Sequence, residues 1–140
     1  MLSSEINRRL FKDKTFMGCF PFDNLPAFPE HLPAKLIVNT GASSTNGEHW
    51  VALLLNPKSC FYFDSFGLPI LDKEILNFLG KRYQSATFSD MCIQNFSSDK
   101  CGNFCIYFLK MVDSKKTYQS FLKCFCDINL AFNDSLLNSI

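Results

Sequence analysis

The sequence has the length and composition of a single folded domain. It holds 140 residues, of which 47% are hydrophobic and 15% aromatic, enough to bury a core and too many for a disordered chain. We therefore predict one domain over residues 1–140. The 14 basic and 13 acidic residues leave a net charge of +1, which gives no electrostatic support for binding to nucleic acid or to an anionic membrane.

Neither a membrane segment nor a disulfide framework is predicted. No apolar run approaches the roughly 18 residues that span a bilayer, and the N-terminal stretch MLSSEINRRLFKDK lacks the apolar segment of a secretory signal. The seven Cys are an odd number without regular spacing, in a chain large enough to fold without crosslinks. These features predict reduced thiols in an intracellular or particle-enclosed protein.

A helix and an irregular loop are predicted in the N-terminal third. Ser3 or Ser4 is suited to cap a helix that continues to about Lys12, because a small hydroxyl side chain can accept a hydrogen bond from an unpaired amide. The four Pro of the stretch PFDNLPAFPEHLP exclude regular structure and predict an ordered loop that ends at a strand.

Three strands follow this loop. The stretch AKLIVNT is apolar and β-branched, and the turn-rich GASSTNGE separates it from the apolar HWVALLLN. A short turn then leads into CFYFD, so residues 49–55 and 60–64 predict a β-hairpin in a central sheet. His49 stands at one end of this hairpin and Asp64 at the other.

Helices dominate the predictions for the C-terminal half. Asp72 is suited to cap a helix to about Tyr83, and the stretch SATFSDMCIQN predicts a strand. Apolar residues recur at helical spacing after Cys101, which places Cys101 at or just before a helix N-terminus. Further helices are expected over 118–126 and 130–138. The predicted fold is α+β, with a mostly antiparallel sheet packed against the helix that starts at Cys101.

The position of Cys101 suits a reactive thiol. The positive end of a helix dipole and a nearby imidazolium can lower the pKa of a thiol from about 8.5 into the range of about 3.5 to 7.5. A thiolate formed in this way is a nucleophile for acyl transfer. A small buried hydrophobe is the alternative reading of an isolated Cys.

The other groups that a cysteine protease needs also have candidates. His31 lies between two Pro, whereas His49 begins an apolar strand that would fix its ring, so His49 is the favoured base. Asp64 could accept the second ring N–H of His49 across the hairpin. The side-chain amide of Gln94, seven residues before Cys101, could donate to an oxyanion together with the Cys101 amide.

Four motifs, taken in chain order, resemble the adenovirus endopeptidase (adenain) family. They are GEHW, FDSFG, Gln94 and CGNFC. The family places His, an acidic residue, Gln and Cys in this order, whereas papain-like enzymes place Cys before His. The stretch IVNT before the His motif, the seven-residue spacing from Gln to Cys and the stretch SLLNS near the C-terminus are also similar. Ubiquitin-like-protein proteases of the same clan share the order more loosely.

The resemblance implies a viral cysteine endopeptidase with an adenain-like fold. Cys101 would be the nucleophile, His49 the base and then the acid, Asp64 the carboxylate that orients His49, and Gln94 an oxyanion donor. Substrates would be viral capsid or core precursor proteins, cut at Gly-containing sites during virion maturation. Substrate contacts are expected at Gly47, Glu48 and Trp50, and the location would be the virion and the nucleus or cytoplasm of the host cell.

The resemblance also bears on cofactors and partners. No cofactor is required for the chemistry, but family members are stimulated by DNA and by a viral peptide that forms a disulfide with the enzyme. Cys92 is the candidate for such a disulfide, although it stands much closer to Gln94 than the family's Cys does. The near-neutral charge gives the DNA activation no support. No membrane partner is expected, and the expected state is a monomer.

Three alternatives stay open from the residues alone. The first is a deubiquitinating or deSUMOylating protease of the same clan, and the second is a catalytically inactive binding module. The third is a thiol-based metal or redox module whose spacings match no common zinc pattern. Its ligands would be a His and four Cys, namely Cys101, Cys105, Cys124 and Cys126.

Overall fold

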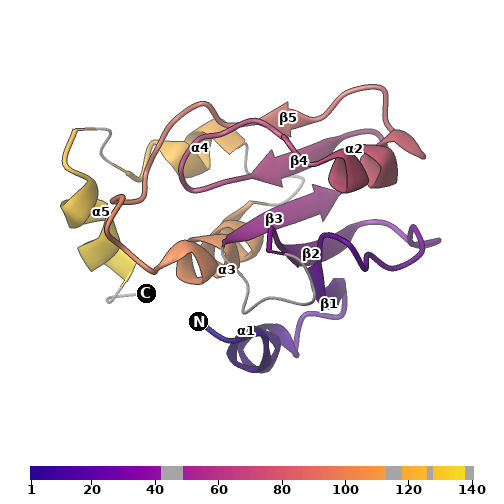
Figure 1. Cartoon of the computed structure of the whole chain (residues 1–140), viewed down its shortest axis with the longest axis horizontal. Helices are drawn as coiled ribbons and strands as arrows, with labels where there is room; N and C mark the ends of the chain where they lie inside the picture. The colour runs from indigo at the N-terminus through magenta and orange to yellow at the C-terminus, as the bar shows by residue number, and fades with distance from the viewer. Residues whose placement is uncertain (42–48, 113–117, 126–127, 138–140) are drawn as a thin grey trace.

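A five-stranded sheet with helices on both faces forms the protein. The structure is a computed structural model that describes residues 1–41, 49–112, 118–125 and 128–137. Its sheet has the strand order β1-β2-β3-β4-β5. The strands are β1 (Phe16–Pro21), β2 (Ala34–Asn39), β3 (Trp50–Leu55), β4 (Cys60–Phe63) and β5 (Thr87–Phe88). The helices are α1 (Ser3–Leu10), α2 (Lys73–Gly80), α3 (Cys101–Met111), α4 (Tyr118–Leu122) and α5 (Leu130–Leu136) (Figure 1).

The sheet is mixed, so the prediction of a mostly antiparallel sheet is wrong, while the α+β class is confirmed. Strand β3 pairs antiparallel with both β2 and β4, but β1 runs parallel to β2 and β5 runs parallel to β4. The reason lies in the connections. The Pro-rich loop returns the chain from the end of β1 to the start of β2, and α2 does the same between β4 and β5, which makes each pair parallel.

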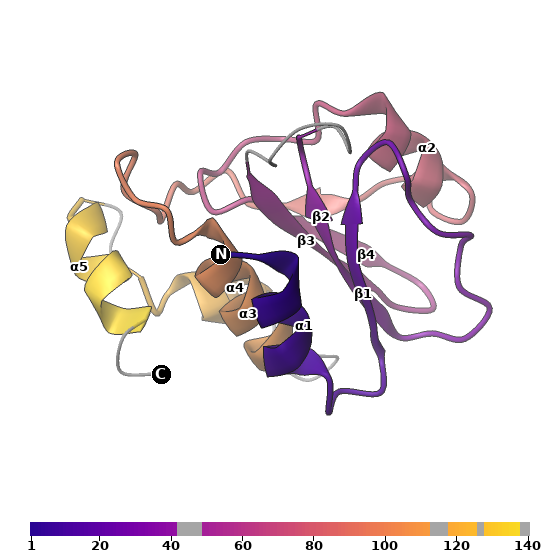
Figure 2. The ribbon, with the colours of Figure 1, turned by 60° about the horizontal axis from the view of Figure 1, so that its bottom comes forward.

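Each face of the sheet carries its own apolar core. On one face Ala52, Leu54 and Phe63 pack with Phe104 and Phe108 of α3, and α1 and α4 complete this core. The other face packs against α2 and the apolar side chains of the Pro-rich loop. Figure 2 shows α1, α3 and α4 on one side of the strands and α2 on the other. Strand β3 thus contributes side chains to both cores, since successive side chains of a strand point to opposite faces of the sheet.

Most of the predicted elements are present. The hairpin of residues 49–55 and 60–64 is β3 and β4, and it leaves His49 just before one strand and Asp64 just after the other. Asp72 caps α2 as predicted, because its carboxylate accepts hydrogen bonds from the amides of Glu74 and Ile75. The helix from Cys101 is α3, the longest helix that the structure describes. The two C-terminal helices are shorter within the described residues than predicted.

Three local predictions differ from the structure. Leu2 is the N-cap of α1, so neither Ser3 nor Ser4 caps it. Of the strand predicted over SATFSDMCIQN only β5 is present, because the chain then turns away from the sheet to form the loop that leads to α3. Strand β1 was not predicted, since its Gly18 and Pro21 are poor strand formers that only an edge position tolerates. No helix in the described part of the chain is long and apolar enough to cross a membrane.

Candidate active site

The thiol of Cys101 lies at the first turn of α3, against the start of β3. Its Sγ accepts a hydrogen bond of 3.5 Å from the backbone amide of Trp50. Further along the same helix, the thiol of Cys105 donates to the carbonyl oxygen of Trp50 at 3.3 Å. Packing of α3 on β3 therefore fixes the sulfur of Cys101 beside the strand that begins after His49.

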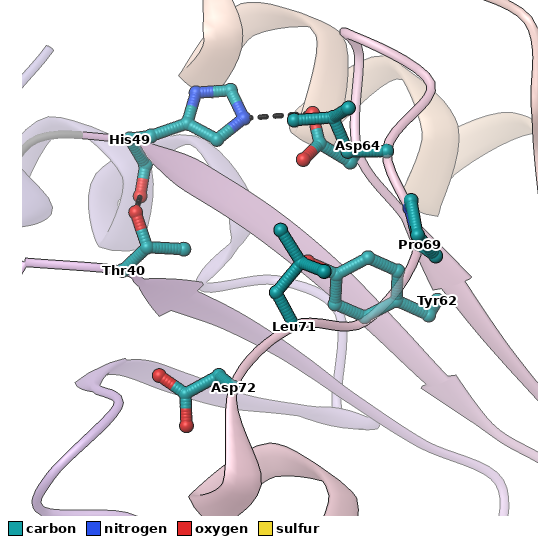
Figure 3. A pocket seen from close by; sticks show the side chains of 8 residues that line it. Thr40, His49, Tyr62, Asp64, Pro69, Leu71 and Asp72 are labelled. Carbon is teal, nitrogen blue, oxygen red and sulfur yellow. Dashed lines mark hydrogen bonds and ion pairs between the residues drawn. The ribbon is translucent and has the colours of Figure 1, made fainter.

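The backbone of His49 is held by the hydrogen bonding between β2 and β3, which continues one residue beyond these strands. Its carbonyl oxygen accepts a hydrogen bond of 2.8 Å from the amide of Thr40. Its ring Nε2 lies 2.8 Å from Oδ1 of Asp64, and Figure 3 shows the imidazole pointing across to this carboxylate. The His49 side chain is only 16% exposed and that of Asp64 only 5%. With Nε2 occupied by Asp64, the other ring nitrogen is the one that is available to Cys101.

The pKa values of His49 and Cys101 shift in opposite directions. Burial would lower the pKa of His49, but hydrogen bonds and charges from Asp64 and Cys101 outweigh burial and raise this pKa to about 9. Burial would raise the pKa of the Cys101 thiol, but hydrogen bonds from His49 and from the Trp50 and Gly102 amides, together with the His49 charge, lower it. Both shifts act in the direction of a thiolate beside an imidazolium.

Gln94 is buried, and both ends of its amide are held. Its side chain is 1% exposed, its Oε1 accepts a hydrogen bond from the hydroxyl of Ser65, and its Nε2 donates to the carbonyl oxygen of Ser98 at 2.9 Å. The carbonyl of Ser98 can only accept, so the nitrogen must face it. Within the described residues this is the one hydrogen bond of Nε2, so its second N–H is available for a further acceptor.

Residues around Gln94 position the loop that carries it. The carbonyl oxygen of Ser65 accepts hydrogen bonds from the amides of Ile93 and Gln94. Gly67 has a positive φ of 76°, and a Cβ there would lie 2.7 Å from the carbonyl carbon of Met91, so only glycine permits this approach. The FDSFG turn thus holds the segment that contains Gln94.

Helix α5 braces the same loop from its other side. The buried Asn133 donates from its side-chain amide to the carbonyl oxygen of Ile93 at 3.1 Å. Oδ1 of Asp134 accepts from the amide of Asn95 at 3.3 Å. These contacts lie on either side of Gln94 in the chain. Sequence reasoning missed Ser65, Asn133 and Asp134, because their roles arise from pairings of residues that are distant along the chain.

The expected substrate-contact residues are only partly within the structure. Gly47 and Glu48 lie outside the described residues. The Trp50 side chain is half-buried, and its indole N–H donates to the carbonyl oxygen of Met1 at 3.1 Å. A Cβ on Gly102 would lie 3.1 Å from Sδ of Met1 and 3.2 Å from Cδ1 of Trp50, so the chain beside Cys101 is closely packed.

The other thiols and the second His differ from Cys101 and His49. Cys105 is fully buried, and burial raises its pKa well above the usual value. The thiol of Cys92 donates to the carbonyl oxygen of Gln94 at 3.3 Å, and burial raises its pKa as well. His31 is exposed in the Pro-rich loop, on the sheet face opposite α3. The structure thus assigns the imidazole beside Cys101 to His49.

No group of three or more His, Cys, Asp and Glu suited to a metal ion is found in the described ranges, which omit Cys126.

A pocket of about 280 Å³ opens beside the His49 and Asp64 pair (Figure 3). Its remaining walls come from Thr40, Tyr62, Leu68, Pro69, Leu71 and Asp72.

Comparison with known proteins identifies relatives of this chain. The family model described as "Adenovirus endoprotease" matches residues 16–139. The protease of bovine adenovirus C serotype 10 is 35% identical over 118 residues, which cover 66% of this chain and 59% of the relative. The protease of human adenovirus B serotype 3 is 37% identical over 117 residues, 66% of this chain and 55% of the relative. The protease of human adenovirus D serotype 17 is 31% identical over 133 residues, 77% of this chain and 63% of the relative. The chain therefore spans less than two thirds of the length of these relatives.

Proposed function

This chain belongs to the adenovirus endoprotease family, and we propose that it is a cysteine endopeptidase that cleaves viral precursor proteins at Gly-containing sites during virion maturation. The observation that carries the proposal is the arrangement of Cys101, His49 and Asp64. A thiol of lowered pKa lies beside an imidazole whose far nitrogen is 2.8 Å from a buried carboxylate. This is the set of groups that acyl transfer by a thiol requires.

In the proposed reaction the Cys101 thiolate attacks the carbonyl carbon of the scissile peptide bond. The oxyanion that forms is stabilised by the free N–H of Gln94 Nε2 and by the Cys101 amide. The His49 imidazolium gives its proton to the leaving nitrogen, the C–N bond breaks, and a thioester with Cys101 is left. His49 then takes a proton from water, which attacks the thioester and releases the acid product and the thiolate.

Two structural features support these assignments. Asp64 fixes the ring of His49 in one orientation and stabilises its charge in a buried site. The double anchoring of the Gln94 amide keeps its nitrogen directed without rearrangement during the reaction, which is the condition for efficient oxyanion stabilisation. No cofactor takes part in this chemistry. Activation by a peptide would require Cys92 to form a disulfide. Burial raises the pKa of this thiol, which disfavours the thiolate that disulfide formation needs.

The test is cleavage of the virus's own precursor proteins and of Gly-Gly-X peptides by the wild type and by Cys101→Ala. We expect the substitution to lower cleavage by roughly 10³-fold or more, as loss of the nucleophile does in other covalent proteases. Cys124→Ala is the matched control, because Cys124 is an exposed free thiol, and it should cleave like the wild type. Cleavage that survives Cys101→Ala would refute the proposal.

The same assay with ubiquitin-like conjugates separates the two protease readings. Preferential cleavage of conjugates over precursor proteins would favour a deubiquitinating or deSUMOylating enzyme. A binding module would cleave none of the substrates. We expect precursor proteins to be the preferred substrates.

A further inference from the structure

Three aromatic rings form a continuous stack that leads from the site to the surface. The ring of Phe66 stacks on the imidazole of His49, with centroids 4.9 Å apart and planes inclined by 24°. The ring of Phe96 stacks on Phe66 in turn, at 6.0 Å and 12°. Phe96 is 82% exposed, whereas Phe66 is half-buried. A large apolar surface therefore begins at the imidazole and ends in solvent.

A well-anchored turn presents the exposed ring. The amide of Ser98 donates to the carbonyl oxygen of Asn95 at 2.9 Å and closes a turn around Phe96. The carbonyl oxygen of Ser98 is bound by Nε2 of Gln94, and the amide of Asn95 is bound by Asp134 of α5. Phe96 is thus held at a defined place beside Gln94, although its own side chain is exposed to solvent.

The proton transfer from His49 indicates which part of a substrate lies over this stack of rings. The leaving nitrogen must take a proton from His49, so it lies within hydrogen-bonding distance of the imidazole. The residues after the scissile bond begin at this nitrogen. They therefore start next to the ring that covers one face of His49, which is Phe66, and can extend toward Phe96.

We propose that Phe66 and Phe96 form a subsite for an aromatic or large aliphatic side chain in the first two residues after the scissile bond. This aromatic subsite rests on the proposed protease function and extends it to the leaving-group side. Its chemistry is stacking and burial of apolar surface, since offset and edge contacts between aromatic rings are favourable.

The experiment compares quenched peptides that share one Gly-Gly segment and carry Phe, Leu, Ser or Gly directly after the cleavage point. We expect the wild type to favour Phe and Leu over Ser by roughly five- to tenfold in kcat/KM, the scale of one partly buried apolar side chain. Phe96→Ala should reduce this ratio to within about twofold of one. Phe11→Ala is the matched control, because Phe11 is 71% exposed at the end of α1, and it should keep the ratio.

Binding separates a failure of the subsite from a failure of the protease function. The same peptides, dye-labelled, are titrated into Cys101→Ala, where fluorescence anisotropy needs no cleavage. If Cys101→Ala binds the Phe peptide more tightly than the Ser peptide, and the double variant with Cys101→Ala and Phe96→Ala binds the two equally, the subsite is supported even when no peptide is cut. Equal binding or equal cleavage of the Phe and Ser peptides by protein with Phe96 intact would overturn it, as would equal ratios for Phe96→Ala and Phe11→Ala.

Discussion

Replacing Asp64 by Asn isolates the charge that maintains the ion pair. The Asn oxygen can still accept the hydrogen bonds that Oδ1 of Asp64 accepts from His49 and from the Phe66 amide, both at 2.8 Å. The geometry is therefore kept while the negative charge is lost. Asp64→Asn thus tests electrostatics rather than folding.

The magnitude follows from the pKa of His49. Its rise from 6.5 to about 9 corresponds to roughly 3.5 kcal/mol at about 1.4 kcal/mol per pKa unit. Burial opposes this rise, and the hydrogen bond to Asp64 is the largest contribution that favours it. Asp64→Asn keeps this hydrogen bond only in its weaker, uncharged form and loses the carboxylate charge, so the pKa of His49 should fall substantially. We expect the proportion of ion-paired Cys101, and with it kcat/KM, to fall by roughly 10- to 10²-fold.

The assay is kcat/KM for a Gly-Gly-X peptide between pH 5 and 10. Besides the loss at neutral pH, the alkaline limb of the profile should move down from about pH 9, because the imidazolium of the variant gives up its proton sooner. Asp72→Asn is the matched control, since Asn is as good an N-cap for α2 as Asp. It should stay within twofold of the wild type. An Asp64→Asn enzyme with wild-type kcat/KM and an unmoved alkaline limb would refute the reasoning.

Three further predictions concern pH, the oxyanion group and the FDSFG turn. In the wild type, kcat/KM should fall above about pH 9 as His49 loses its proton, whereas a profile that rises through about 8.5, the ordinary thiol pKa, would speak against a preformed ion pair. Ser65→Ala leaves the buried Oε1 of Gln94 without its donor and should lower kcat about tenfold at nearly constant KM; a change in KM alone would assign Ser65 to substrate binding. Gly67→Ala places a Cβ 2.7 Å from a backbone carbonyl carbon at positive φ and should lower the free energy of unfolding by about 2 kcal/mol or more. Gly80→Ala, where nothing lies within 4 Å, should not destabilise the protein in the same denaturant titration.

The local elements of the fold were predictable because their signals are local. Two apolar runs joined by a short turn define the hairpin of β3 and β4, and helical spacing with a capping Asp72 defines α2. The direction of the two outer strands was not predictable in this way. It depends on how the Pro-rich loop and α2 cross the sheet, which no short stretch of sequence records.

In the candidate site, too, local contacts were predictable and contacts between distant segments were not. The hairpin itself places His49 and Asp64 together, so their pairing could be inferred from the spacing of 15 residues. The contact of Ser65 with Gln94 spans 29 residues, and that of Asn133 with the loop before Gln94 spans 40. Such pairs follow from tertiary packing, and Ser and Asn carry no distinctive signal in sequence because they are common in turns and on surfaces.

The most direct test of the central claim is to trap the thioester on Cys101. A peptide with a Gly-Gly acyl segment and a fast leaving group is mixed with the enzyme, quenched in acid within milliseconds and analysed by intact mass and by peptide mapping. We predict one acyl adduct, on Cys101, which forms before product accumulates and is absent from Cys101→Ala. Peptide cleavage without an adduct, or with the adduct on another Cys, would contradict the assignment of Cys101 as the nucleophile.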